Sequence, residues 1–324
     1  MHVPDHLINN GTELVAAAGA AAVIGTVAIR SRSMATVDPT GGQAPTLLDE
    51  PEAMGAQLAT AALVFALQMV NFPVLPGTSG HLLGGALATA LIGPRRALLA
   101  VSSVVIAQTL VFADGGVGAL GVNLWLIAIL PVAVAAAVQR FLAARRSGSE
   151  APWWATAGLA ALLGPPISSL AFATFYATGT AGDAPAGRVA ASMLAVHLAI
   201  GVGEAVLTLA ALWAVQRVPV WGVAMTAAVG LSLAASSHPD GLERVAGDLG
   251  FAVTGPGSIL HRSPFADYSV SGLEGWISGS AAGLVGLVMT CAVCAATAGL
   301  TRRQSPTAEA RIRSGSLGSQ GPLS

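Results

Sequence analysis

The sequence predicts an all-α, polytopic integral membrane protein with about nine transmembrane helices. Of its 324 residues, 54% are apolar and only 10% are charged, whereas a soluble domain carries roughly a quarter charged residues. The apolar residues also fall into runs close to the roughly 20 residues that a helix needs to cross a bilayer. Lipid is therefore the expected environment of most of the chain.

Nine apolar runs are predicted to span the membrane. They cover residues 13–29, 57–72, 81–94, 97–113, 119–142, 153–176, 189–215, 219–235 and 277–299. The run over 81–94 is short and bounded by glycine, which is typical of a partial or tilted span. Small residues are frequent throughout, with 39 glycines, so neighbouring helices can approach closely.

The arginines predict the orientation of these helices. Loops that face the cytoplasm are enriched in Arg and Lys, and all 15 basic residues of this chain are arginine. With the N-terminus outside, 12 of the 15 fall on the cytoplasmic side, and only Arg188, Arg244 and Arg262 fall outside. We therefore expect an external N-terminus, a cytoplasmic C-terminus and a location in the cell membrane.

Polar stretches divide the chain into units. Residues 30–56 read as a cytoplasmic linker and residues 236–276 as an external segment with its own turns. We expect a membrane domain over 1–235 and an accessory unit over 236–300, with an external loop and one membrane helix. The Ser/Gly/Arg-rich residues 301–324 are predicted to be a disordered cytoplasmic tail.

Composition argues against two kinds of partner or activity. The formal net charge is −1, so no nucleic-acid partner is indicated. A phosphate-binding P-loop needs a lysine, and the chain has none. Any ATP hydrolysis linked to this protein is therefore expected to fall to another subunit.

The first two residues can form a metal chelate. The amine of Met1, together with the backbone nitrogen and imidazole of His2, can bind one ion through fused rings and leave a fourth position open. Imidazole suits Ni, Co, Cu and Zn, and square-planar or tetragonal nitrogen sites favour Ni(II) and Cu(II). Taken alone, however, the dipeptide is more simply read as a polar residue at the membrane interface.

A second histidine occupies an unusual segment. His81 follows two prolines and a Gly-Thr-Ser-Gly turn, which cannot continue a regular helix. Irregular backbone near membrane depth is stable only where protein or a cavity surrounds it, and an ionisable residue there indicates a functional site. The predicted topology puts His81 on the same outer side as His2, so its imidazole could fill the open position.

Taken together, these segments resemble the CbiM/NikM family, the substrate-capturing membrane subunits of energy-coupling-factor (ECF) transporters for cobalt and nickel. The matching segments are 1–5 (Met-His-Val-Pro-Asp), 68–74, 77–85 (Gly-Thr-Ser-Gly-His-Leu-Leu-Gly-Gly), 112–116, 119–123 and 197–204. Residues 239–243 (Pro-Asp-Gly-Leu-Glu) resemble the PDGLE domain, an accessory unit fused here to the C-terminal side.

The resemblance implies a metal site and partners. In the family the ion is held by the N-terminal amine, the backbone nitrogen and imidazole of residue 2, and a later histidine, which correspond here to Met1, His2 and His81. It further implies transported Ni(II) or Co(II), no permanently bound cofactor, a transmembrane coupling subunit and a pair of cytoplasmic ATPases. The chain would then be a transport subunit and not an enzyme. Nickel and cobalt are not separated by these atoms, although the PDGLE-like segment favours nickel slightly.

The sequence leaves more than one role open for several other polar residues. As hydrogen-bonding supports of the site we expect Asp114, Asn123 and Ser79, since metal-bound histidines usually bond an outer acceptor. His6 stands where the family often has Gly, and we favour a bystander over an axial ligand or a distortion of the site. For His197 and Glu204 we favour structural hydrogen bonding between helices over a polar track or support of the segment around His81. For His238 and His261 we favour surface positions over weak ion-collecting ligands.

A rival hypothesis is a rhomboid-like intramembrane serine protease. Ser79 lies in a Gly-x-Ser-Gly pattern, and His197 lies in a later helix. Nucleophilic catalysis would need Ser79 within hydrogen-bond reach of its base. This hypothesis leaves Met1, His2 and His81 without a role.

Overall fold

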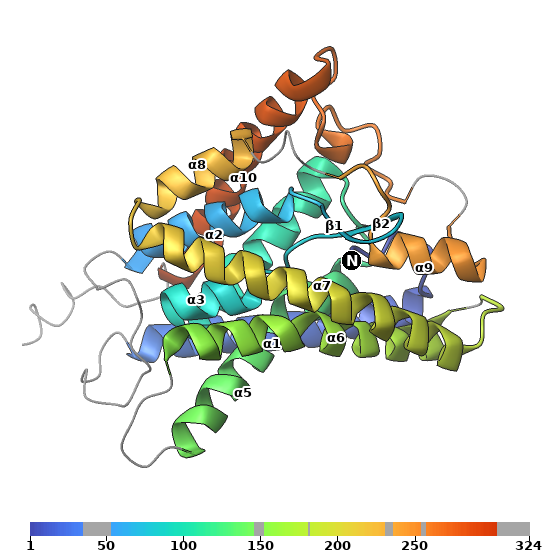
Figure 1. Ribbon diagram of the computed structural model, residues 1–324, viewed down its shortest axis with the longest axis horizontal. Helices are drawn as coiled ribbons and strands as arrows, with labels where there is room; N and C mark the ends of the chain where they lie inside the picture. Colours follow the sequence, from blue (N-terminus) through green and yellow to red (C-terminus); the bar gives the residue numbers. More distant parts are fainter. Residues whose placement is uncertain (35–52, 146–151, 181, 231–235, 254–256, 303–324) are drawn as a thin grey trace, which may run out of the picture.

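The computed structural model describes residues 1–34, 53–145, 152–180, 182–230, 236–253 and 257–302. Within them the fold is a helix bundle with a small β-hairpin beside the N-terminal residue (Figure 1). The elements are α1 (Asn10–Met34), α2 (Ala53–Gln68), β1 (Phe72–Leu75), β2 (Thr78–Gly80), α3 (Gly85–Phe112), α4 (Leu120–Asn123), the π-helix η1 (Leu124–Ile129), α5 (Leu130–Arg145), α6 (Trp153–Gly179), α7 (Ala186–Val215), α8 (Val220–Gly230), α9 (Gly241–Leu249), the 3₁₀ helix η3 (Ala266–Tyr268) and α10 (Gly275–Arg302).

Long apolar helices make the chain a multi-pass membrane protein. In the described part of the chain, six are long and apolar enough to cross a bilayer: Asn10–Arg30, Gly85–Phe112, Leu120–Arg145, Trp153–Gly179, Ala186–Val215 and Gly275–Thr297. Two shorter apolar helices cover Met54–Gln68 and Val220–Gly230. The count of nine spans and the orientation stay predictions. Most of the predicted linker, over 35–52, and the tail over 303–324 lie outside the described residues.

Helix α3 contains a break that separates the two predicted runs 81–94 and 97–113. Gly93 has non-helical backbone angles (φ 74°, ψ 161°) and is followed by Pro94. Glycine tolerates positive φ, and proline removes a helical hydrogen bond. His81 precedes α3 and Asp114 follows it, yet both contact His2. The two arms of α3 therefore fold back to the same place.

The all-α prediction omitted a β-hairpin. Strands β1 and β2 pair antiparallel, with Phe72 opposite Gly80, Pro73 opposite Ser79 and an irregularity before the Leu75–Thr78 pair. The prolines exclude a helix here, and backbone groups at membrane depth need partners, which the hairpin supplies. The turn contains Gly77 at φ 71°.

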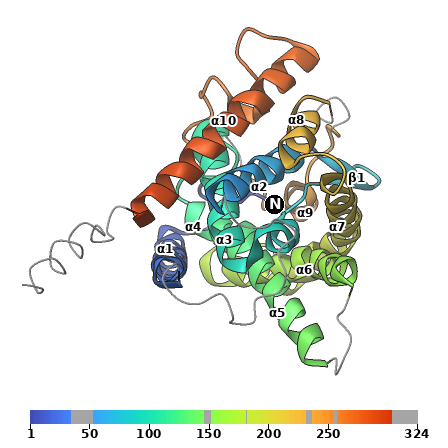
Figure 2. The same ribbon diagram turned by 90° about the vertical axis from the view of Figure 1, so that its left-hand side faces the viewer.

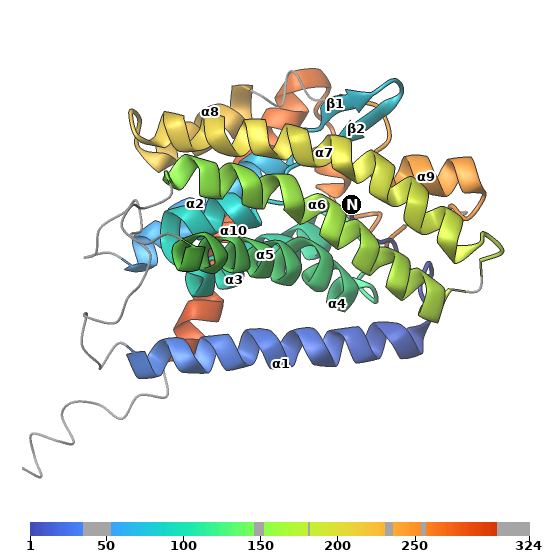
Figure 3. The same ribbon diagram turned by 60° about the horizontal axis from the view of Figure 1, so that its bottom comes forward.

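Close helix contacts at glycines hold the accessory helix and the bundle together. Helix α10 lies against α2, α3 and α8 (Figure 2). A Cβ on Gly286 would lie 1.9 Å from the Phe65 ring, and one on Gly283 would lie 2.7 Å from the Ala228 carbonyl oxygen. By contrast, α1 lies along one side of the bundle (Figure 3) and exposes Leu14 and Val15, as expected of a lipid-facing helix.

We predict that Gly201→Ala destabilises the α6–α7 pair. A Cβ at Gly201 would lie 2.4 Å from the Leu162 carbonyl oxygen, so the two helices must move apart, at a cost of about 1–3 kcal/mol. Gly187→Ala is the matched control, because this glycine is on the same helix with no atom within 4 Å of an added Cβ. Thermal unfolding of the detergent-purified chain should show a lower midpoint for Gly201→Ala alone, and equal midpoints would contradict the packing.

Candidate metal centre

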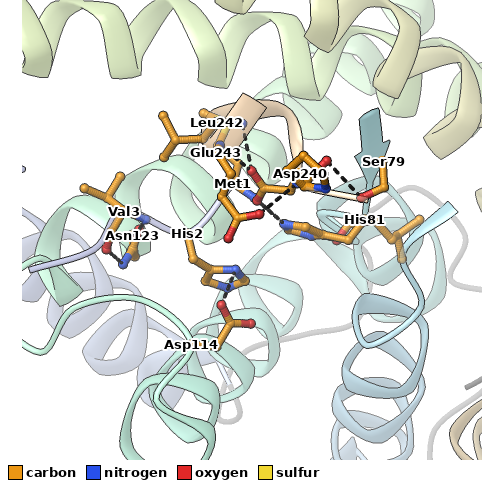
Figure 4. A network of polar contacts seen from close by, with 12 residues as sticks. Met1, His2, Val3, Ser79, His81, Asp114, Asn123, Asp240, Leu242 and Glu243 are labelled. Carbon is orange, nitrogen blue, oxygen red and sulfur yellow. Dashed lines mark hydrogen bonds and ion pairs between the residues drawn. The ribbon is translucent and has the colours of Figure 1, made fainter. Parts of the chain in front are cut away.

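The N-terminal residues are buried in the bundle and held there by Asn123. Met1 is 3% exposed and Val3 is fully buried. Val3 N donates to Asn123 Oδ1 at 2.7 Å, and Asn123 Nδ2 donates back to Val3 O at 3.0 Å (Figure 4). The amide of Asn123 thus pairs with the main chain as a neighbouring strand would, and it fixes the backbone next to His2.

Asp5 ties the N-terminal segment to two other loops. Its Oδ1 accepts a hydrogen bond from Gly118 N at 2.8 Å, and its Oδ2 accepts one from Ile259 N at 3.2 Å. Its own N–H donates to Gly257 O at 2.8 Å. A Cβ on Gly116 would lie 2.3 Å from Asp5 N, so the loop after α3 needs glycine there to approach.

The three predicted ligand residues lie together. The Met1 amine contacts His81 Nε2, and the imidazole rings of His2 and His81 are stacked, with centroids 5.1 Å apart and planes inclined by 21°. Figure 4 shows this group between the end of β2 and the start of α9. No three His, Cys, Asp or Glu side chains in the described residues cluster closely enough to hold an ion.

Both imidazoles are in the form that binds metals. Burial, followed by the nearby N-terminal ammonium, lowers the pKa of His2 and of His81 to about 3. They are therefore neutral at pH 7. The Nδ1 atom of His81 lies 3.0 Å from Leu82 O, so Nδ1 is the protonated nitrogen and Nε2 carries the lone pair toward the Met1 amine.

The ring of His2 faces two side-chain oxygens, of which a neutral imidazole can donate to only one. Its Nδ1 lies 3.1 Å from Asp114 Oδ1, and its Nε2 lies 3.3 Å from Gln108 Oε1. Asp114 also accepts a hydrogen bond from the Tyr268 hydroxyl at 2.5 Å, and burial raises the pKa of Asp114. The Tyr268 ring stacks on Phe112 with centroids 4.9 Å apart. The accessory segment thus reaches His2 through Asp114.

Asp240 brings a carboxylate to the Met1 amine. Its Oδ2 lies 2.7 Å from the amine and 3.9 Å from His81 Nε2. Its Oδ1 accepts hydrogen bonds from Leu242 N and Glu243 N, and Glu243 Oε2 accepts one from Asp240 N, which completes a capping box at the start of α9. Burial would raise the pKa of Asp240, but the adjacent ammonium and His81 lower it well below its usual range.

The segment that carries His81 is fixed on both sides. Before it, Ser79 N donates to Pro239 O at 2.9 Å. After it, the Glu204 carboxylate accepts hydrogen bonds from Leu83 N (3.0 Å) and Gly84 N (3.1 Å). Glu204 therefore holds the segment after His81 in place from helix α7.

The contacts of Ser79 and His197 do not form a catalytic pair. Ser79 Oγ donates to His238 O at 2.7 Å. His197 Nδ1 lies 2.8 Å from Met193 O, and its Nε2 has no hydrogen-bond partner in the described residues. The protease hypothesis lacks the hydrogen bond that it requires. His197 instead lines a small cavity together with Met1, His81 and Asp240.

The other histidines lie at the surface. His6, His238 and His261 are exposed, and His238 bonds the Ser236 hydroxyl. His6 has a φ of 70°, a left-handed conformation that glycine adopts without strain. This angle explains why glycine suits position 6.

Sequence reasoning missed three residues of this site, namely Asp240, Gln108 and Tyr268. The Asp-x-x-Glu spacing of Asp240 and Glu243 signals a helix N-terminus, and this could have located α9. Nothing in the local sequence links Asp240 to Met1, which is 239 positions away.

Comparison with known proteins bears on this arrangement. Residues 2–221 match the CbiM family, described as the cobalt uptake substrate-specific transmembrane region, and residues 217–303 match the PDGLE domain. The PDGLE match thus includes α8, whereas the predicted accessory unit begins at 236. That predicted boundary stays a prediction.

Several relatives carry similar descriptions. A putative metal transport protein of Haloquadratum walsbyi is 35% identical over 64% of this chain and 86% of its own length. A putative fused nickel transport protein NikMN of Archaeoglobus fulgidus is 52% identical over 25% of this chain, and the match spans only 27% of that relative. A cobalt transport protein CbiM of Roseiflexus is 31% identical over 46% of this chain and 59% of its own length.

A solved structure shares the fold. The crystal structure of a transition metal transporter superposes with a TM-score of 0.54 at 23% identity, covering 67% of this chain and 93% of that one. Because the CbiM match covers more than half of the sequence, the chain belongs to the CbiM family of cobalt and nickel transport proteins and carries a fused PDGLE domain.

Proposed function

We propose that this chain captures Ni(II) or Co(II) on the outer side of the membrane and passes it across as part of an ATP-driven ECF-type transporter. The ion is held by four nitrogens: the Met1 amine, the His2 backbone nitrogen and imidazole, and the His81 imidazole. A transmembrane coupling subunit and a pair of cytoplasmic ATPases supply the energy, in keeping with the absence of lysine for a P-loop.

One observation carries this proposal, the contact of the Met1 amine with His81 Nε2 next to the stacked His2 ring. Chelation by His2 through Nδ1 requires its ring to turn, since Nδ1 now faces Asp114 at 3.1 Å. A planar four-nitrogen set favours Ni(II) over Zn(II), which prefers a tetrahedral arrangement. Copper binds nitrogen ligands more strongly still, so its exclusion depends on availability.

Inserting two alanines between Met1 and His2 should abolish tight binding of Ni(II) and Co(II). The insertion keeps every side chain but breaks the chelate, whereas a single inserted residue would build a Met-Ala-His N-terminus whose amine, two amide nitrogens and imidazole form a four-nitrogen site of their own. His81→Ala should have a similar effect, and we expect each loss to exceed the roughly 100-fold that removal of an outer hydrogen-bond partner costs. Calorimetric titration of the purified chain measures both, with the exposed His238→Ala as the matched control. Native-like binding by both variants would refute the nitrogen site.

Each bound ion should release protons, because the amine and the backbone amide must be deprotonated to bind it. The imidazoles should release none, because burial and the N-terminal ammonium lower the pKa of both to about 3. Binding should therefore weaken as the pH falls. A pH-indicator titration with NiCl₂ counts the protons, and a count of four would mean that the imidazoles are charged.

His6→Gly should stabilise the chain and leave ion binding unchanged. Glycine relieves a left-handed backbone (φ 70°) that costs a non-glycine residue about 1 kcal/mol. His6→Ala removes the same imidazole but keeps the strain, so it should bind ions equally and unfold at a lower temperature than His6→Gly. Loss of binding in both variants would instead identify His6 as a ligand.

A further inference from the structure

We propose that Asp240 is a positioning residue of the metal centre: its carboxylate holds the Met1 amine beside His81 and balances the positive charge of the centre. This inference rests on the proposed nitrogen site. It makes the Pro-Asp-Gly-Leu-Glu motif of the accessory domain a working part of that site.

The two oxygens of Asp240 have separate tasks. Oδ1 caps helix α9 by accepting hydrogen bonds from Leu242 N at 2.7 Å and Glu243 N at 2.9 Å. This leaves Oδ2 directed at the Met1 amine, at 2.7 Å. The helix cap fixes the rotamer of the side chain, so the position of α9 determines where the amine is held.

The neighbouring motif residues bring α9 to the site. Pro239 O accepts the Ser79 N–H, which joins the accessory segment to the strand that leads into His81. A Cβ on Gly241 would lie 2.9 Å from Ile200 Cδ1 and 3.0 Å from His197 Cε1. Glycine at 241 therefore permits the close approach of α9 to α7.

Charge is balanced around this carboxylate. Asp240 Oδ2 lies 2.7 Å from the Met1 amine and 3.9 Å from His81 Nε2. A dication bound by these nitrogens would lie close to the same carboxylate, whose negative charge offsets part of the charge of the ion. The other nearby acids have different partners, Asp114 with Tyr268 and His2, and Glu243 with the α9 cap. Asp240 and Met1 line the same small cavity as His81 and His197.

The test compares Asp240→Asn with Asp248→Asn in the full-length purified chain. Asparagine caps helices as well as aspartate, so α9 should persist while the charge at the amine is lost. Asp248 is on the same helix, is exposed and pairs with Arg244 at 2.8 Å, so its replacement makes the same charge change away from the centre. Asp240→Ser, which also retains a capping group, serves as the second variant.

Calorimetric titration with Ni(II) and Co(II) should show about 10- to 100-fold weaker binding for both Asp240 variants and a change within about twofold for Asp248→Asn. Unfolding temperatures should match the native chain. Native affinity in the Asp240 variants would overturn the inference while leaving the nitrogen site intact. Weaker binding that comes with a lower unfolding temperature in both variants would overturn it in favour of a purely structural role. If the native chain itself binds neither ion, the proposed function would be refuted instead.

Discussion

The burial of a charged amine inside a membrane protein governs the arrangement around it. Met1 is 3% exposed, and a buried charge is costly unless it is paired and hydrogen-bonded. The pairing comes from Asp240, and the neutral His81 lies on the other side of the amine. Asn123 holds the adjoining backbone and Asp5 fastens it to two loops. Together these contacts keep the N-terminal segment in the interior of the bundle, where its charge and polar backbone would be unstable without partners.

Irregular backbone is concentrated where it serves this arrangement. The break at Gly93 folds α3 back, so that the segments before and after it both reach His2. The hairpin of β1 and β2 satisfies the backbone of a proline-containing stretch and leads into His81. The backbone after His81 is held by Glu204 from α7, which accepts hydrogen bonds from Leu83 N and Gly84 N. Regular helices supply the frame, and the departures from regularity deliver the polar groups.

The sequence predicted the membrane helices and the candidate ligand residues better than the tertiary contacts between them. Hydrophobic runs located α1, α6, α7 and α10, because burial in lipid demands them. The Pro/Gly segment before His81 marked an irregular structure. The hairpin pairing was not predictable in the same way, since it depends on partners such as Pro239 that arrive from distant sequence. Asp240 was not predicted to lie at the site for the same reason. Its spacing to Glu243 indicates a helix cap, and only the folded chain brings it to Met1.

The packing of α10 has a consequence for assembly. Gly283 and Gly286 allow this helix to pack closely against α8 and α2. The accessory segment therefore contacts the Met1 amine of the same chain. A partner on the same chain acts at an effective concentration set by the chain itself and not by the amount of protein. Its contact with the amine can therefore be individually weak and still persist, and every copy of the membrane domain carries one copy of the motif.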